Sequence, residues 1–185
     1  MFDRKQISGI ILSGGKSSRM GRDKALIRFR GKLLINYATE LMHELSDEII
    51  ISTNSEDYNK LNYLVVSDNY KNVGPLGGIE AALRLSDNKL NLIAPCDNPF
   101  LTKELFHLLL NKIDGFDAAV PRNLKGKIEP LTACYSKEVL PVIVRQIEKG
   151  DFKVQNFLKQ IRTTYVDTNY TFENFNAPGD LNGYG

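Results

Sequence analysis

The stretch from Ile7 to Lys24 reads ISGIILSGGKSSRMGRDK, and it carries the strongest indications of both fold class and ligand. Its first part, Ile7 to Leu12, is an apolar run of strand length and predicts a buried β-strand. Gly14 and Gly15 follow almost at once. Glycine lets the backbone adopt positive φ and approach a ligand closely, and successive backbone N–H groups can surround an anion. The stretch therefore predicts a strand followed by an anion-binding loop.

Three cationic side chains, Lys16, Arg19 and Lys24, share this loop. They favour phosphate as the ligand, with Arg19 able to form paired hydrogen bonds and Lys24 acting as a point charge. Two commoner phosphate loops are excluded by spacing. A P-loop needs glycine and lysine where this chain has Arg19 and Met20, and a dinucleotide fingerprint needs a G-x-G-x-x-G spacing that is absent here. The alternative is a plain turn with solvated charges.

Along the rest of the chain, apolar runs of strand length alternate with amphipathic runs of helix length. This order predicts an α/β fold with a mostly parallel sheet covered on both faces. Ligands of such sheets bind beyond the carboxyl ends of the strands, where three unusual loops fall: 13–24, 68–78 and 95–100. The predicted strands are 7–12, 48–53, 61–67, 90–94, 117–121, 130–135 and 163–167, and the predicted helices are 34–46, 78–86, 102–113, 136–149 and 154–160.

Length and composition place limits on function. The 185 residues favour a single domain, 1–185. The net charge of +2, without a basic stripe, argues against a nucleic-acid partner. No segment resembles a signal peptide or membrane span, and two cysteines without metal-like spacing fit a reducing compartment. We therefore expect a cytoplasmic protein.

Carboxylates at strand ends are the candidate metal ligands. Asp97 follows a predicted strand within Pro95-Cys96-Asp97-Asn98-Pro99-Phe100, and Asp68 follows another. Magnesium takes oxygen ligands, often one or two carboxylates with water and substrate phosphates, so Asp97 is the preferred ligand. Either aspartate could instead cap a turn. Cys96 has no histidine partner in the pattern and is interpreted as a buried packing residue.

A second glycine-rich segment, Gly74-Pro75-Leu76-Gly77-Gly78, also follows a predicted strand. It could pass close to a flat base or a sugar, or it could be a helix-entry turn. The residue pattern leaves both interpretations open.

Together these motifs resemble the MobA-type molybdenum cofactor guanylyltransferase family, within the nucleotidyltransferase superfamily. The resemblance spans nearly the whole chain, in order. It rests on 12–26, Asp68, 74–78, Cys96 to Phe100, Glu129-Pro130-Leu131 ahead of Tyr135, and 174–181.

The resemblance implies a Rossmann-like three-layer α/β/α fold, similar to nucleotide-diphospho-sugar transferases. It implies an enzyme that transfers GMP from GTP to molybdopterin-bound molybdenum, with Mg²⁺ as cofactor and pyrophosphate as the second product. A molybdoenzyme or its chaperone would receive the cofactor.

The resemblance also assigns roles to residues. Asp97 would bind both GTP and magnesium, and catalysis would rest on Arg19, Lys24 and Asp97. Acceptor contacts fall on Asn174 and Asn176. The nucleotide-binding set is Leu12, Ser13, Gly14, Gly15, Lys24, Ser52, Asn54, Asp68, Gly74, Gly78 and Asp97.

Two other functions stay open. One is a related nucleotidyltransferase that uses CTP or another acceptor, such as a pterin cytidylyltransferase or an enzyme of sugar or isoprenoid phosphates. The Gly14-Gly15 pair favours guanine, because cytidine-using relatives tend to carry alanine before the last glycine. The other is a non-catalytic nucleotide-binding protein, against which the presence of both Lys24 and Asp97 argues.

Overall fold

The computed structural model describes residues 3–14 and 24–170, and it confirms the α/β class. A seven-stranded sheet has the order β5-β4-β1-β6-β8-β7-β9. Strand pairs β5–β4, β4–β1, β1–β6 and β7–β9 are parallel, whereas β8 runs antiparallel to both of its neighbours. The strands are β1 (Ile7–Leu12), β4 (Glu48–Ser52), β5 (Leu64–Val66), β6 (Leu90–Pro95), β7 (Ala118–Asn123), β8 (Ala133–Ser136) and β9 (Thr163–Thr168).

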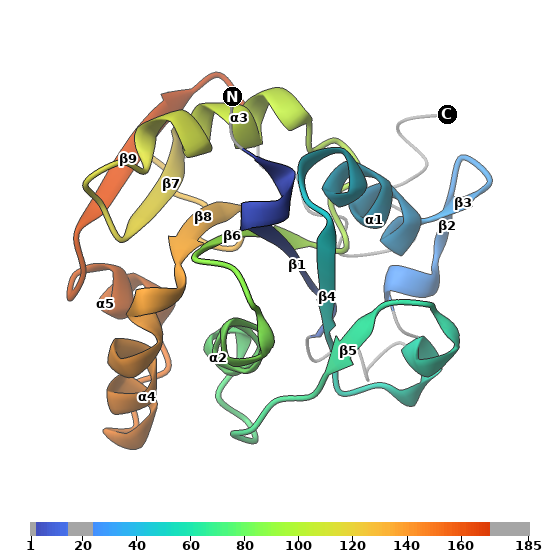
Figure 1. Ribbon diagram of the computed structural model, residues 1–185, viewed down its shortest axis with the longest axis horizontal. Coiled ribbons are helices and arrows are strands. Elements are labelled where there is room, and N and C mark those ends of the chain that lie inside the picture. Colours follow the sequence, from blue (N-terminus) through green and yellow to red (C-terminus); the bar gives the residue numbers. More distant parts are fainter. Residues whose placement is uncertain (1–2, 15–23, 171–185) are drawn as a thin grey trace.

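Helices cover both faces of this sheet, as Figure 1 shows: α1 and α3 lie on one face, and α2, α4 and α5 on the other. Their bounds are α1 (Leu34–Leu45), α2 (Pro75–Leu85), α3 (Lys103–Lys112), α4 (Leu140–Glu148) and α5 (Val154–Leu158). Short 3-10 helices occupy Arg4–Gln6, Lys24–Leu26, Glu56–Lys60 and Lys137–Val139.

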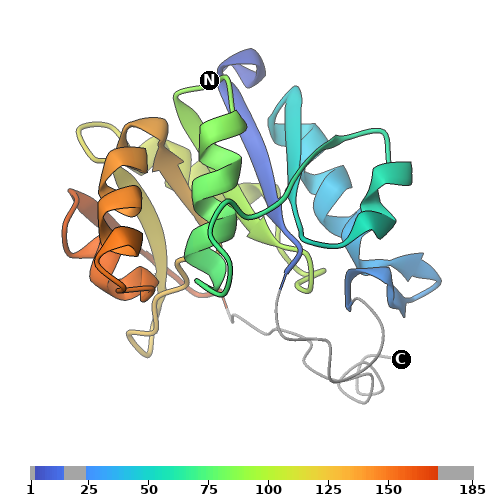
Figure 2. The ribbon, with the colours of Figure 1, turned by 90° about the horizontal axis from the view of Figure 1, so that it is seen from below.

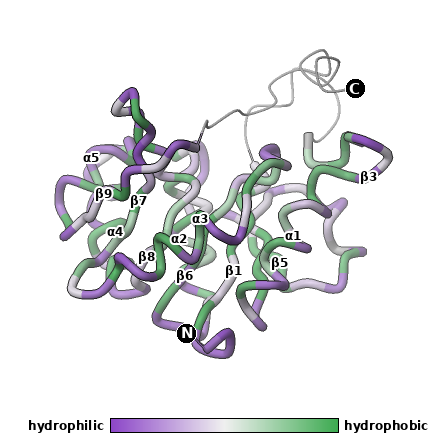
Figure 3. Tube along the Cα trace, turned by 90° about the horizontal axis from the view of Figure 1, so that it is seen from above, coloured by the Kyte–Doolittle hydropathy of each residue, from purple (hydrophilic) through white to green (hydrophobic). Residues whose placement is uncertain are grey.

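The core is split between the two faces because successive strand residues point to opposite sides. In β1, Ile7 and Ile11 pack with α1 and α3, whereas Ile10 packs with α2 and α4. Gly9 lies on the α1 side, where a Cβ would stand 2.9 Å from Met42 Cβ. The missing side chain therefore lets α1 pack close to β1. Hydrophilic residues gather in the peripheral loops (Figure 3).

Several elements differ from the sequence expectation, among them the strand expected at 61–67, which begins only at Leu64. A small hairpin, β2 (Arg28–Phe29) with β3 (Lys32–Leu33), was not predicted, because two-residue strands carry no measurable alternation. The strand expected at 130–135 begins only at Ala133, after a turn. The segment 136–149 is divided between a 3-10 turn and α4, since Pro141 occupies the first turn of the helix.

The 74–78 segment is mainly helix rather than turn. Gly74 is the N-cap of α2 and has φ 67° and ψ −154°, a conformation that favours glycine. Pro75 then opens the helix, which contains Gly77 and Gly78. Within residues 3–14 and 24–170, each helix is too short or too polar to cross a bilayer.

Candidate functional site

The carboxyl ends of the parallel strands place most of the described candidate residues along one edge of the sheet. Figure 2 shows this edge, at which β1 ends and from which the hairpin after β7 projects. Leu12, Ser52 and Pro95 lie at matching positions of β1, β4 and β6. Ser13, Asn54 and Asp97 therefore leave the sheet side by side, and Asp68 follows Val66 of β5, which pairs with Ser52.

The start of the glycine-rich loop is fixed by hydrogen bonds to the neighbouring strands. The Ser13 N–H donates to the Ser52 carbonyl at 2.8 Å, and the Cys96 N–H donates to the Leu12 carbonyl at 3.1 Å. The Ser13 hydroxyl lies 2.5 Å from the hydroxyl of Tyr58, and both residues are buried. The backbone at this edge is therefore held before the loop begins. Sequence reasoning had not identified Tyr58.

Asn54 and Asp68 form two hydrogen bonds with each other. The Asp68 N–H donates to Asn54 Oδ1 at 3.0 Å, and Asn54 Nδ2 donates to Asp68 Oδ2 at 3.1 Å. The reciprocal pair joins the ends of β4 and β5, with Asn54 exposed and Asp68 half-buried. Ser52, in contrast, is buried at 3% exposure. Asn54 thus has a defined task at this edge, which is to orient the Asp68 carboxylate.

Two glycines allow α2 to begin directly against this pair. A Cβ on Gly78 would lie 2.7 Å from Ser52 Oγ and 3.6 Å from Asp68 Oδ1, and one on Gly77 would lie 3.4 Å from Asp68 Oδ2. A side chain at Gly78 would clash with Ser52, and one at Gly77 would lie 2.5 Å from Val73 Cγ2, whereas the distances to Asp68 are ordinary contacts. The carboxylate of Asp68 therefore lies beside the N-terminal turn of α2, where the helix dipole favours negative charge.

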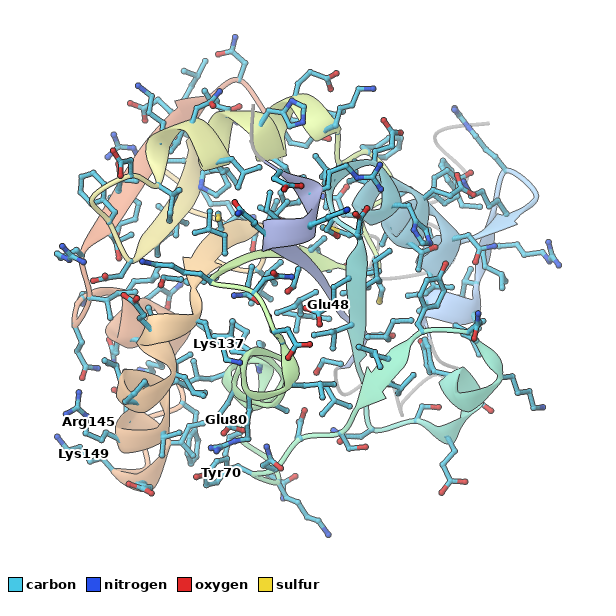
Figure 4. All side chains as sticks on the ribbon, in the orientation of Figure 1. Glu48, Tyr70, Glu80, Lys137, Arg145 and Lys149 are labelled. Carbon is cyan, nitrogen blue, oxygen red and sulfur yellow. The ribbon has the colours of Figure 1, made fainter. Side chains whose placement is uncertain are left out.

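A buried glutamate ties α2 to the loop that carries Asp68. Glu80 on α2 has a fully buried side chain, beside Tyr70 in Figure 4. Its carboxylate accepts from Asn69 Nδ2 at 2.9 Å and from Arg84 Nε at 2.8 Å. Since Asn69 directly follows Asp68, this network fixes the loop as well as the helix. The sequence pattern gave no sign of it, because a glutamate on a helix is usually solvated.

Asp97 lies at the end of β6 and is half-buried. A second carboxylate, Glu129, stands near it. Burial raises the pKa of Glu129, while the charge of Lys127 and the Leu131 N–H act to lower it and the charge of Asp97 acts to raise it. Sequence reasoning gave Glu129 only as part of a motif and assigned it no role. The edge therefore brings two carboxylates together beside the loop expected to bind phosphate.

Both cysteines are buried and outside any disulfide, and Cys96 packs in the core, in agreement with the sequence interpretation. Within residues 3–14 and 24–170, histidine, cysteine, aspartate and glutamate form no group of three or more that could hold a metal ion.

Several predicted residues lie outside the described residues: Gly15, Arg19, Asn174 and Asn176. The backbone of Lys24 begins the 3-10 helix Lys24–Leu26.

A three-layer α/β/α fold with Ser13, Asp68 and Asp97 at the carboxyl edge of its sheet fits a nucleotidyltransferase scaffold. The family model for the MobA-like NTP transferase domain matches residues 9–164, so the chain belongs to that family.

Relatives that match most of the chain are described as molybdenum cofactor guanylyltransferases. The chain is 34% identical to the probable molybdenum cofactor guanylyltransferase of Carboxydothermus hydrogenoformans, over 89% of this chain and 83% of the relative. It is 32% identical to the molybdenum cofactor guanylyltransferase of Vibrio campbellii, over 100% and 98%.

Among solved structures, the molybdopterin-guanine dinucleotide biosynthesis protein A of Archaeoglobus fulgidus is similar, with a TM-score of 0.79, 26% identity and 95% of each chain covered. The 2-C-methyl-D-erythritol 4-phosphate cytidylyltransferase of Thermus thermophilus shares the fold, with a TM-score of 0.70 and 14% identity over 93% and 94% of the two chains.

Proposed function

We propose that this protein is a molybdenum cofactor guanylyltransferase, which transfers GMP from GTP to molybdopterin-bound molybdenum and releases pyrophosphate. Membership of the MobA-like family and the names of relatives that match nearly the full chain support this proposal. The structural observation that carries it is the alignment of Ser13, Asp68 and Asp97 along one strand edge. We also propose that residues 1–185 act as one domain, since a single seven-stranded sheet joins strands from Ile7 to Thr168.

The nucleotide lies across the ends of β1, β4 and β5. Its phosphates bind the backbone of Leu12, Ser13, Gly14 and Gly15; among residues 3–14 and 24–170, a Cβ on Gly14 would have no neighbour within 4 Å. The ribose and base extend toward Asp68, which Asn54 orients, and toward the N-terminal turn of α2. Ser52, Gly74 and Gly78 form part of the same site. The Ser52 side chain is buried and packs against Gly78.

Asp97 would hold Mg²⁺ together with phosphate oxygens of GTP. The residue present fits this ion, because the half-buried carboxylate of Asp97 at the end of β6 supplies a hard oxygen ligand. When bound, the ion would neutralise charge on the triphosphate.

The reaction needs no protein nucleophile, since the acceptor phosphate is already ionised at neutral pH. One of its oxygens attacks the α-phosphorus of GTP, and the bond from that phosphorus to the β-phosphate oxygen breaks as pyrophosphate leaves. The Ser13–Gly15 amides, Arg19 and Lys24 stabilise the negative charge that develops, which is usually the largest catalytic contribution. Holding both substrates in line supplies much of the rest.

The acceptor lies on the other side of Asp97 from the nucleotide, and we assign its binding to Asn174 and Asn176 on the family resemblance alone, since both fall outside the described residues. The recipient of the product is a molybdoenzyme or its chaperone. We place the reaction in the cytoplasm, in agreement with two free cysteines.

The Asp97→Asn variant tests the function. Formation of the guanine dinucleotide cofactor from GTP and molybdenum-loaded molybdopterin should fall at least about a hundredfold, as expected for loss of about 3 kcal/mol of preorganised charge stabilisation. The control is Asp114→Asn, an exposed aspartate in the turn after α3. Full product formation by Asp97→Asn at saturating Mg²⁺ would remove Asp97 from the mechanism, and absence of product from the wild-type protein would refute the function itself.

A further inference from the structure

The order of the strands divides the candidate site into two halves. The ends of β5, β4 and β1 carry Asp68, Asn54 and Ser13, and Asp97 follows the central strand β6. Beyond β6 lie β8, β7 and β9, whose ends at this edge have no part in the proposed nucleotide site. Because β8 is antiparallel to β6 and Ile93 pairs with Ala133, the residues just before Ala133 lie at the edge that holds Asp97.

The segment before Ala133 is a turn fixed at several points. The Glu129 N–H donates to the Pro121 carbonyl of β7 at 3.1 Å, and the Thr132 N–H closes the turn on the Glu129 carbonyl at 3.1 Å. The hydroxyl of Tyr135, fully buried in β8, donates to the Pro130 carbonyl at 2.9 Å. This contact gives the Glu-Pro-Leu…Tyr motif a physical reason, since the tyrosine sets the position of the turn that carries Glu129.

Glu129 presents a mostly desolvated carboxylate at this place. Its side chain is 13% exposed, and Oε2 lies 3.8 Å from Lys127 Nζ, which is an ion pair rather than a hydrogen bond. An ionised carboxylate can accept about four hydrogen bonds. Within residues 24–170, the Leu131 N–H is the one hydrogen bond assigned to it. Acceptor capacity therefore remains, and it is directed by a rigid turn.

The flanking segments contain two further polar atoms whose hydrogen bonding is unmet. Asn98 Nδ2, next to Asp97, and Thr132 Oγ1 are buried, and neither has a hydrogen-bond partner among the described residues. Buried polar groups nearly always have partners. These atoms belong to the two segments that carry Asp97 and Glu129, so this part of the edge has hydrogen-bonding capacity that the described residues leave unmet.

We propose that Glu129 binds the acceptor by accepting hydrogen bonds from two adjacent N–H donors of its pterin ring, the exocyclic amine and the neighbouring ring N–H. The proposal rests on the proposed function, which supplies a pterin acceptor. Paired bonds from adjacent donors to one carboxylate are strong and directional. Lys127 at 3.8 Å offsets the charge of Glu129, which would otherwise repel the acceptor phosphate.

Guanine carries the same pair of N–H donors as the pterin, so either ring could bind a carboxylate in this way. The strand order favours the pterin, because Glu129 lies across Asp97 from Asp68 and Asn54, the residues assigned to the nucleotide. A third possibility is that Glu129 is a second magnesium ligand. Each source predicts a different measured change when the carboxylate is altered.

The experiment compares Glu129→Gln and Glu129→Asp with wild type, and uses Glu138→Gln as matched control. Glu138 forms an exposed ion pair with Lys89, 3.2 Å long, after the other end of β8. For each protein, the KM of molybdenum-loaded molybdopterin, kcat, the Kd of a fluorescent GTP analogue, the half-saturating Mg²⁺ concentration and the unfolding temperature are measured. Binding of a simple fluorescent pterin, 6-hydroxymethylpterin, gives a readout besides activity.

We expect Glu129→Gln to raise the acceptor KM and the pterin Kd at least tenfold, with kcat and the GTP Kd within about threefold of wild type. Glu129→Asp should recover part of the affinity, and Glu138→Gln should match wild type. A rise in the GTP Kd instead would assign Glu129 to guanine, and a rise in the Mg²⁺ requirement would assign it to the metal; either overturns the proposal. Unchanged acceptor and pterin affinity also overturns it. Failure of wild type to form product is a separate result, which refutes the proposed function.

Discussion

One added methyl group should lower the stability of the fold at Gly9 but the affinity for GTP at Gly14. Gly9 lies within β1, and its Cβ would stand 2.8 Å from Ser46 Oγ and 2.9 Å from Met42 Cβ. Met42 Cβ is fixed to the backbone of α1 and cannot rotate away. Gly9→Ala therefore forces α1 from the sheet, and such overpacking typically costs about 1–3 kcal/mol. For a chain of this size, about 2–4 °C per kcal/mol gives a fall of roughly 2–12 °C in unfolding temperature.

Gly14→Ala adds the same methyl where no atom of the described residues lies within 4 Å and where φ lies outside the left-handed region. Its unfolding temperature should stay within about 2 °C of wild type, a change worth less than about 1 kcal/mol. Its methyl would occupy the space assigned to phosphate, so GTP affinity should fall at least tenfold, or about 1.4 kcal/mol.

The assay is thermal unfolding followed by circular dichroism, with GTP binding measured at a temperature where all proteins are folded. Ser46→Ala in the Gly9→Ala background removes one of the contacting atoms and should recover part of the loss. Unchanged stability of Gly9→Ala would refute the packing argument, and wild-type GTP affinity of Gly14→Ala would refute the close approach of phosphate to this loop.

Three further predictions concern the acceptor half, pH and thiol reactivity. Tyr135→Phe removes the hydrogen bond to the Pro130 carbonyl; it should cost about 1 kcal/mol in urea unfolding and raise the acceptor KM, and no change in either would contradict the role given to the turn. Hydrogen bonds from Arg162 lower the pKa of Asp117, so this stabilisation is present above the unfolded value near about 4 and is lost as pH falls through the lowered pKa. The stability difference between wild type and Asp117→Asn should therefore shrink from pH 7 to pH 3; a constant difference would count against it. Burial raises the pKa of the Cys134 thiol to about 12, so a thiol reagent at pH 8 should label it only after unfolding, whereas rapid labelling of folded protein would be unexpected.

The sequence predicted the central strands well because their apolar runs are bounded by loops of distinct composition. Ile7–Leu12 is reproduced without change, and the loops after β1, β5 and β6 lie at one edge as expected. Local patterns failed where tertiary pairing decides the outcome. The antiparallel direction of β8 is set by its neighbours, and nothing in its four residues encodes it.

The sequence predicted those site residues whose type and position after a strand indicate a function by themselves. Asp68 and Asp97 were found because carboxylates follow strands, but the partners that hold Asp68 depend on contacts across the sheet. Glu80 was missed because burial of a helical glutamate depends on packing. The nearness of Glu129 to Asp97 joins residues from separate loops, and only the Glu-Pro-Leu…Tyr motif hinted at its importance.

The proposed function requires GMP transfer to molybdopterin-bound molybdenum. The most direct measurement incubates the purified protein with Mg²⁺, molybdenum-loaded molybdopterin and either GTP or CTP, then quantifies pyrophosphate and identifies the pterin product by mass spectrometry. We expect pyrophosphate release with GTP, an equal amount of guanine dinucleotide cofactor, and little product with CTP. Preferential use of CTP, or GTP binding without pyrophosphate release in the presence of the acceptor, would contradict it.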